Sequence, residues 1–192
     1  MHGAPCTLDD RAIRVALVAA LAAADPAGRV RHELDVAACR VDVALIGEHE
    51  LTGYEINLRR LAGQAAAYSA VLDRVTLVAT GHHLDHAAAR VPAWWGLTRA
   101  EDADGHVRLV CVRPTGINPA VDPAELVRLL WREEARTLLW QRGRRRGTSR
   151  LRRGELQDAV AADYPLDELR AAVRRMLRAR PAAWTAASVA VG

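Results

Sequence analysis

The sequence contains no lysine and no phenylalanine, and it has only three cysteines. All 27 residues counted as Lys or Arg are therefore arginine, which stays protonated and is a poor general base. Without phenylalanine, the hydrophobic 51% of the chain must build an aliphatic core, with five tryptophans as the large anchors. A length of 192 residues predicts one domain, or one domain with a small appendage.

The cysteines exclude a disulfide framework, because their number is odd, they lie far apart and they form no Cys-x-x-Cys pattern. Reduced thiols are typical of a cytoplasmic protein. The apolar stretch at residues 16–24 is too short to span a membrane and is interrupted by Asp25-Pro26. No targeting segment is recognisable at the N-terminus, so we expect a cytoplasmic protein without a membrane partner.

The hydrophobic pattern predicts an α/β chain with a helical C-terminal third. The expected helices cover residues 10–24, 58–72, 83–90, 125–141, 151–162 and 166–178, and the expected strands cover residues 30–34, 41–46, 51–57, 74–79 and 106–112. A Pro-, Gly- and Asn-rich segment separates the two parts. We therefore predict a core at 1–113, a linker at 114–124 and a helical extension at 125–192 that packs on the core.

Three acidic residues, Glu33, Asp42 and Glu55, stand on the predicted strands. Because strand side chains alternate, we expect Asp42 to share a face with Ala44. Carboxylates on neighbouring strands can hold Mg²⁺, with the Ile56 carbonyl as a further oxygen ligand. Such an ion polarises a phosphoryl oxygen and lowers the pKa of an attacking water. The same acids could instead be solvent-facing partners of nearby arginines.

Several collinear segments together carry a family resemblance. They are residues 40–44 (RVDVA), 53–56 (GYEI), 61–64 (LAGQ) with Tyr68-Ser69, 73–78 (DRVTLV), 92–96 (PAWWG) and 129–134 (LLWREE). The chain resembles a family of bacterial proteins assigned to the PD-(D/E)XK nuclease-like superfamily, over roughly residues 10–180. The resemblance implies a restriction-endonuclease-like fold, which is a mixed sheet flanked by helices.

The resemblance also implies a site. Asp42 matches the metal-binding aspartate, Glu55 matches the acidic residue of the (D/E)XK element, and Glu33 matches the preceding acidic position. Gln64 and Tyr68 match a Gln-x-x-x-Tyr pattern that lines the site in several relatives, and one helical turn separates them. The implied metal is Mg²⁺ or Mn²⁺, bound by Asp42 and Glu55.

The chain departs from the family pattern at Asn57, where lysine is expected. Asn57 could align a water molecule but supplies no charge. The leading hypothesis is metal-dependent nucleic-acid binding with phosphodiester hydrolysis, in which Glu33 assists and Asn57 or Gln64 orients water. One alternative is a catalytically inactive pseudonuclease that serves as a binding or assembly subunit. Another is a recruited fold with different metal-dependent chemistry on a small molecule.

These hypotheses predict different arrangements. A nuclease predicts a metal at Asp42 and Glu55 in an open basic groove. A scaffold predicts that these carboxylates pair with Arg40, Arg59 or Arg60.

A net charge of +4 and a pI of about 9.5 permit a polyanionic partner. The predicted nucleic-acid-binding residues, with DNA as the expected partner, are Arg142, Arg144, Arg145, Arg146 and Arg150. No aromatic residue interrupts this stretch, so the sequence does not suggest base stacking. A solvated charged linker between helices is the alternative, and a protein partner or a homo-oligomer remains open.

Overall fold

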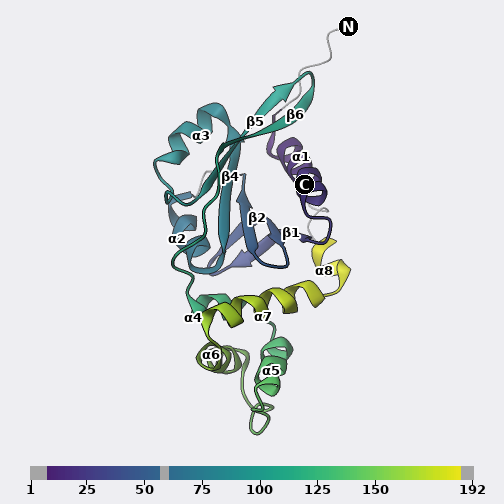
Figure 1. Cartoon of the computed structure of the whole chain (residues 1–192), viewed down its shortest axis with the longest axis vertical. Coiled ribbons are helices and arrows are strands. Elements are labelled where there is room, and N and C mark those ends of the chain that lie inside the picture. The colour runs from purple at the N-terminus through teal and green to yellow at the C-terminus, as the bar shows by residue number, and fades with distance from the viewer. Residues whose placement is uncertain (1–7, 57–60, 187–192) are drawn as a thin grey trace.

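The computed structural model describes residues 8–56 and 61–186 of the chain. Its strands form a six-stranded mixed sheet in the order β1-β2-β3-β4-β5-β6 (Figure 1). The strands are β1 (Arg29–Val36), β2 (Cys39–Ile46), β3 (Leu51–Glu55), β4 (Arg74–Thr80), β5 (Gly96–Ala103) and β6 (His106–Arg113). Strand β2 is antiparallel to β1 and β3, β4 and β5 continue parallel to β3, and β6 is antiparallel to β5.

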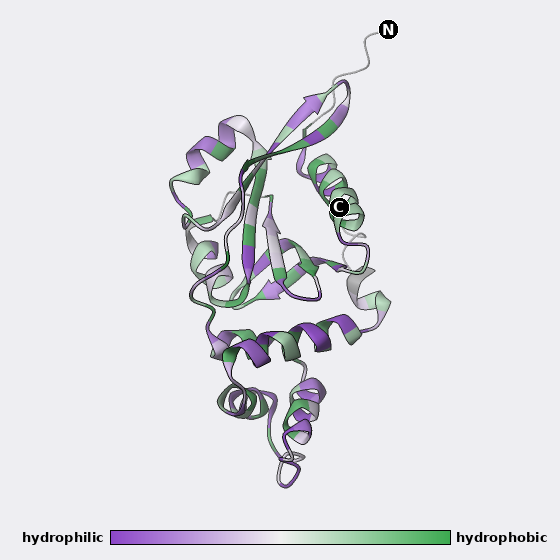
Figure 2. Cartoon of the chain, in the orientation of Figure 1, coloured by the Kyte–Doolittle hydropathy of each residue, from purple (hydrophilic) through white to green (hydrophobic). Residues whose placement is uncertain are grey.

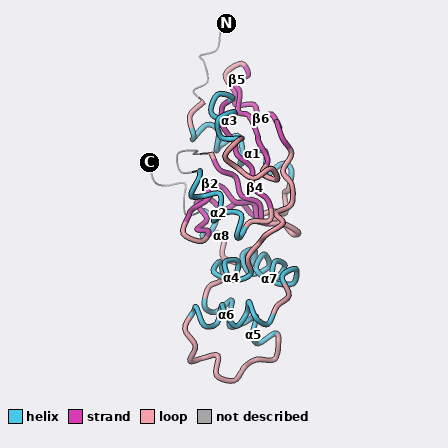
Figure 3. The backbone as a smooth tube through the Cα atoms, turned by 90° about the vertical axis from the view of Figure 1, so that its left-hand side faces the viewer, coloured by secondary structure: helices cyan, strands magenta, loops and turns pink. Residues whose placement is uncertain are grey.

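Helices flank this sheet and fill the C-terminal third of the chain (Figures 1 and 3). They are α1 (Asp10–Ala24), α2 (Leu61–Val71), α3 (Gly81–Ala88), α4 (Pro123–Leu126), the 3₁₀ helix η2 (Val127–Leu129), α5 (Arg132–Gln141), α6 (Arg153–Asp163), α7 (Leu166–Ala179) and α8 (Ala182–Ala186). The predicted α/β class, a mixed sheet flanked by helices with C-terminal helices, is confirmed. None of the described helices is both long enough and apolar enough to cross a bilayer.

Helix α1 packs on one face of the sheet. Asp9 caps the helix, because its carboxylate accepts a hydrogen bond from the Ala12 amide at 2.7 Å. Ile13, Leu17 and Leu21 recur at helical spacing on the buried side. The same cluster contains the buried strand residues Val43, Val78 and Ala100, and Ile56, which directly follows β3. This packing brings α1 against the strands that carry the acidic residues.

The main core lies on the other face, where the sheet meets α2, α3 and the C-terminal helices. Leu169, Val173 and Leu177 of α7 belong to the same buried cluster as Val36 and Ile46 of the sheet. Hydrophobic residues dominate β4, whereas α7 alternates between hydrophobic and hydrophilic residues, as expected for a helix with one buried side (Figure 2). The helical extension therefore packs on the sheet and shares its core.

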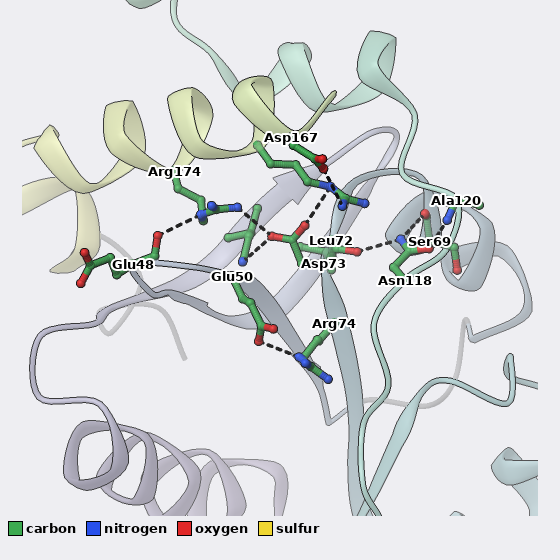
Figure 4. Close-up of polar contacts among 12 residues, drawn as sticks. Glu48, Glu50, Ser69, Leu72, Asp73, Arg74, Asn118, Ala120, Asp167 and Arg174 are labelled. Atoms are coloured by element: carbon green, nitrogen blue, oxygen red, sulfur yellow. Dashed lines mark hydrogen bonds and ion pairs between the residues drawn. The ribbon is translucent and has the colours of Figure 1, made fainter. Parts of the chain in front are cut away.

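A buried carboxylate fastens α7 to the sheet (Figure 4). Asp73, just before β4, accepts a hydrogen bond from the Leu51 amide at 2.7 Å. Its oxygens lie 3.2 Å from Arg170 and 3.3 Å from Arg174, both on α7. Burial raises the pKa of Asp73, and the Leu51 amide and the two arginines oppose that rise. The Arg174 guanidinium also donates to the Glu48 carbonyl at 3.2 Å.

Helix α8 is absent from the sequence prediction, and two further elements differ from it. Residues 125–141 do not form one helix, because the chain becomes extended at Leu130, whose ψ is 138°. Leu130 is fully buried, and α5 begins after Trp131, whose amide donates to the Glu134 carboxylate at 2.7 Å. Strand β5 escapes the hydrophobic pattern because charged side chains occupy its second half. In both places, tertiary packing outweighs the local pattern.

Candidate functional site

Glu33 and Asp42 lie opposite each other where the alternation of two paired strands is interrupted. The β1–β2 ladder pairs the residues on either side of them, and Glu33 has a φ of +54°, which L-residues rarely adopt. In a regular strand, residues three positions apart point to opposite faces. Val41 and Ala44 nevertheless both belong to the main core, whereas Val43 belongs to the core under α1. The expectation that Asp42 shares a face with Ala44 is therefore wrong, because Asp42 contacts α1 instead.

Arg14 of α1 bridges the two acids. Its guanidinium lies 3.0 Å from Asp42 Oδ1 and 3.3 Å from Glu33 Oε1, and it also donates to the Asp42 carbonyl at 2.6 Å. The nearby His32 has a lowered pKa, first because of burial and then because of the charge of Arg14. Sequence reasoning missed Arg14, whose only signal is its place beside Ile13 in the buried stripe of α1.

Glu55 ends β3 and is buried, with 1% of its surface exposed. It accepts a hydrogen bond from Gln64 Nε2 at 3.1 Å, and its Oε2 lies 2.8 Å from the Tyr68 hydroxyl. Both partners come from α2, as the spacing of Gln64 and Tyr68 predicts. Burial, and then the charge of Asp42, raises the pKa of Glu55 to about 8. This shift favours the protonated form of Glu55.

The hydrogen bonds of Tyr68 support the same protonation state. Its hydroxyl lies 2.8 Å from Glu55 Oε2 and 2.6 Å from the Arg40 carbonyl, and it has a single proton to donate. Both hydrogen bonds form together only when Glu55 donates a proton to Tyr68 and Tyr68 donates to Arg40. Burial and the proximity of Glu55 also raise the pKa of the Tyr68 hydroxyl, which keeps it protonated.

The donor set fits a hard divalent ion in its chemistry. Asp42 and Glu55 supply carboxylate oxygens, and the Oε1 atom of Gln64 is buried without a hydrogen-bond partner among the described residues. As placed, Asp42 Oδ1 contacts Arg14 and Oδ2 accepts the Ile56 amide at 2.7 Å. Within residues 8–56 and 61–186, no group of three His, Cys, Asp or Glu side chains is arranged to hold a metal. Bound metal would therefore require Asp42 to exchange its contact with Arg14.

An open hollow of about 660 Å³ lies beside this cluster. Glu33 and Gln64 line it together with Asp35 and Arg40. Arg40 pairs with Asp35 at 2.8 Å rather than with the acids of the cluster. Asn57, Arg59 and Arg60 lie outside the described residues.

The predicted nucleic-acid-binding arginines are not brought to the acidic cluster. They lie in the loop of residues 142–152 between α5 and α6, at the end of the molecule beyond α7 (Figures 1 and 3). Arg142 is ion-paired with Glu168, and Arg144 lies 3.3 Å from Asp163. The other three members of the predicted set, Arg145, Arg146 and Arg150, have exposed side chains. Any nucleic-acid contact made here is therefore separate from the acidic cluster.

The fold and the site define an α/β protein with an acidic cluster in which Glu55 is buried and Arg14 bridges Glu33 and Asp42. The chain belongs to the family of bacteriophage P4 protein cII, whose family model matches residues 7–186. No curated protein matches the chain. It is similar to the solved structure of SPO1766, a protein of unknown function from Silicibacter pomeroyi, with 22% identity and a TM-score of 0.41. That match covers 65% of this chain and 86% of the other.

Proposed function

We propose that this chain is a divalent-metal-dependent, nucleic-acid-binding protein of the PD-(D/E)XK nuclease type, in which Arg14 supplies the positive charge that Asn57 lacks. The main support for this proposal is the ion pair between the Arg14 guanidinium and Asp42, next to Glu55. A cation at this place stabilises the negative charge that develops on a phosphoryl group during hydrolysis. Because arginine stays protonated, Arg14 acts through its charge and its hydrogen-bond donors. The expected partner is DNA and the expected compartment is the cytoplasm.

Asp42 and Glu55 would hold Mg²⁺ or Mn²⁺, with Gln64 Oε1 beside them. The bound ion polarises the phosphoryl oxygen and lowers the pKa of an attacking water. To hold the ion, Asp42 would have to give up its contact with Arg14, and Glu33 would keep the guanidinium close. Glu55 must lose its proton, so metal affinity rises with pH toward the Glu55 pKa of about 8.

The second candidate is a catalytically inactive pseudonuclease that uses the fold for binding or assembly. It is favoured by the engagement of both Asp42 carboxylate oxygens, one by Arg14 and one by the Ile56 amide. In this case Arg14 is the resident cation of the site and no metal enters. The third alternative, chemistry on a small molecule, requires a closed pocket, and the hollow beside the cluster is open.

The test measures Mn²⁺ binding and cleavage of single- and double-stranded DNA and RNA. The variants are Asp42→Ala, Glu55→Gln and Arg14→Gln. Asp35→Asn is the matched control, because Asp35 lines the same hollow from β1 and pairs only with Arg40 in the described contacts. We expect Mn²⁺ binding and cleavage to disappear in Asp42→Ala and to persist in Asp35→Asn.

Measurements on Arg14→Gln and on the unchanged chain together separate the two candidates. A nuclease predicts that the variant binds Mn²⁺ more tightly, because a competing cation is gone, while cleavage falls about 10²- to 10³-fold. A pseudonuclease predicts no metal-dependent cleavage by the unchanged chain with any of the four substrates. Mn²⁺ affinity that is the same in Asp42→Ala and in the unchanged chain would reject the metal site.

A further inference from the structure

The loop between α5 and α6 is built around an exposed tryptophan. Trp140, near the end of α5, has 40% of its surface exposed. Its indole N–H donates to the Thr148 hydroxyl at 3.0 Å, and that hydroxyl donates to the Arg145 carbonyl at 2.9 Å. Thr148 itself is 1% exposed. The ring is therefore held in a defined orientation while much of it faces solvent.

Arginines surround this ring. The Arg136 guanidinium lies 4.9 Å from the Trp140 ring centroid, and the Arg145 guanidinium lies 6.0 Å from it. Arg146 and Arg150 follow in the same loop, and no acidic side chain pairs with either of them within the described parts of the chain. Arg136 is ion-paired with Glu133, so the uncompensated positive charge in this part of the described structure belongs to the loop arginines that follow Trp140.

Loop shape contributes to this arrangement. Gly143 and Gly147 have φ values of +80° and +81°, which allow the chain to turn tightly on both sides of Arg145 and Arg146. The Arg144 amide donates to the Leu139 carbonyl at 2.9 Å, which ties the loop back to α5. The arginine stretch follows Trp140 directly in the sequence, and the turns at Gly143 and Gly147 fold it back so that the Arg145 guanidinium lies 6.0 Å from the ring centroid.

We propose that Trp140 and the arginines Arg145, Arg146 and Arg150 form a binding surface for single-stranded nucleic acid. The arginines contact phosphates and an unpaired base stacks on the exposed part of the indole. A duplex would offer the phosphates but keep its bases stacked internally, so the aromatic face favours a single strand. The proposal rests on the proposed function only for the class of partner, and it requires neither metal nor cleavage.

The test measures binding of a labelled single-stranded DNA oligonucleotide to the full chain by fluorescence anisotropy, in the presence of EDTA. Trp140→Leu should weaken binding about tenfold, whereas Trp140→Phe, which keeps an aromatic face, should retain most of it. Arg146→Gln combined with Arg150→Gln should reduce the slope of log affinity against log salt by about 0.7 for each phosphate that the arginines no longer neutralise. Arg108→Gln is the matched control, an exposed arginine on the distant β6, and should leave binding unchanged.

Three results would overturn the proposal. The first is an affinity for the oligonucleotide that neither the tryptophan nor the arginine variants change. The second is that Trp140→Leu weakens the binding of an abasic strand as much as that of the normal strand. The third is stronger binding of an acidic peptide than of the oligonucleotide. If Trp140→Leu fails to fold, the double arginine variant decides alone, because its side chains form no ion pair in the described structure. Because EDTA removes divalent metal, loss of Mn²⁺ binding at Asp42 would leave this result unaffected.

Discussion

Replacing Glu55 with glutamine should change how the stability of the protein depends on pH. The folded protein raises the pKa of Glu55 from 4.5 to about 8, so folding favours the protonated acid. The stability that this protonation contributes is fully present below about pH 4.5. It is lost as the pH rises toward 8 and above, because the unfolded chain ionises first.

The size of the effect follows from the shift. Each pH unit between the two pKa values removes about 1.4 kcal/mol, which sets an upper limit of about 5 kcal/mol on the loss at pH 9. Glutamine has the hydrogen-bonding pattern of the protonated acid: its NH₂ can donate to Tyr68, and its oxygen can accept from Gln64. We expect Glu55→Gln to match the unchanged chain near pH 5 and to exceed it by about 3–5 kcal/mol at pH 9.

Urea unfolding followed by circular dichroism at pH 5, 7 and 9, in EDTA, measures this difference. Asp35→Asn serves as the control, because it removes an exposed acid from the same pair of strands and should follow the unchanged chain. Parallel curves for Glu55→Gln and the unchanged chain across this range would refute the reasoning. Glu55 would then be ionised in the folded protein, and the hydrogen-bond chain through Tyr68 would run differently.

Three further changes test the packing around the site and the sheet, each measured as the urea midpoint of unfolding. Tyr68→Phe should cost about 1–3 kcal/mol at pH 6, because it removes a buried hydroxyl that bonds Glu55 and a backbone carbonyl, and an unchanged midpoint would contradict this. Gly53→Ala should cost about 1–3 kcal/mol, because the new Cβ would lie 2.4 Å from Leu72 Cδ1, and an unchanged midpoint would contradict this by showing that Leu72 adopts another rotamer at no cost. Arg174→Met should cost about 3 kcal/mol by breaking a buried ion pair between α7 and the sheet, and a stabilised variant would show that apolar packing there outweighs the charge.

The fold was predictable where the local pattern and the tertiary packing agree. Helix α1 follows its buried stripe, and β4 follows its apolar run. The break at Leu130 was not predictable, because apolar residues continue at helical spacing on both sides and only burial in the shared core selects the extended conformation. Strand β5 was not predictable either, because its charged side chains do not follow a strand pattern. Its backbone pairing with β4 and β6 makes it a strand.

The acidic cluster was only partly predictable. Sequence order singled out Glu33, Asp42 and Glu55, but the alternation of side chains is interrupted at Glu33, which has a positive φ, and at Asp42 opposite it, and no period-2 pattern reveals this. Arg14 is 28 positions from Asp42, and the contact exists because α1 crosses β2 at that point. Their roles in binding metal and in hydrolysis stay predictions.

The buried carboxylate of Asp73 couples the unfolding of the sheet to that of the C-terminal helices. Its two arginine partners belong to α7, although Asp73 itself lies just before β4. A fragment that ends before the helical extension would leave this acid without its counterions and would uncover the apolar face on which α7 rests. We therefore expect the sheet and the C-terminal helices to unfold as one cooperative unit.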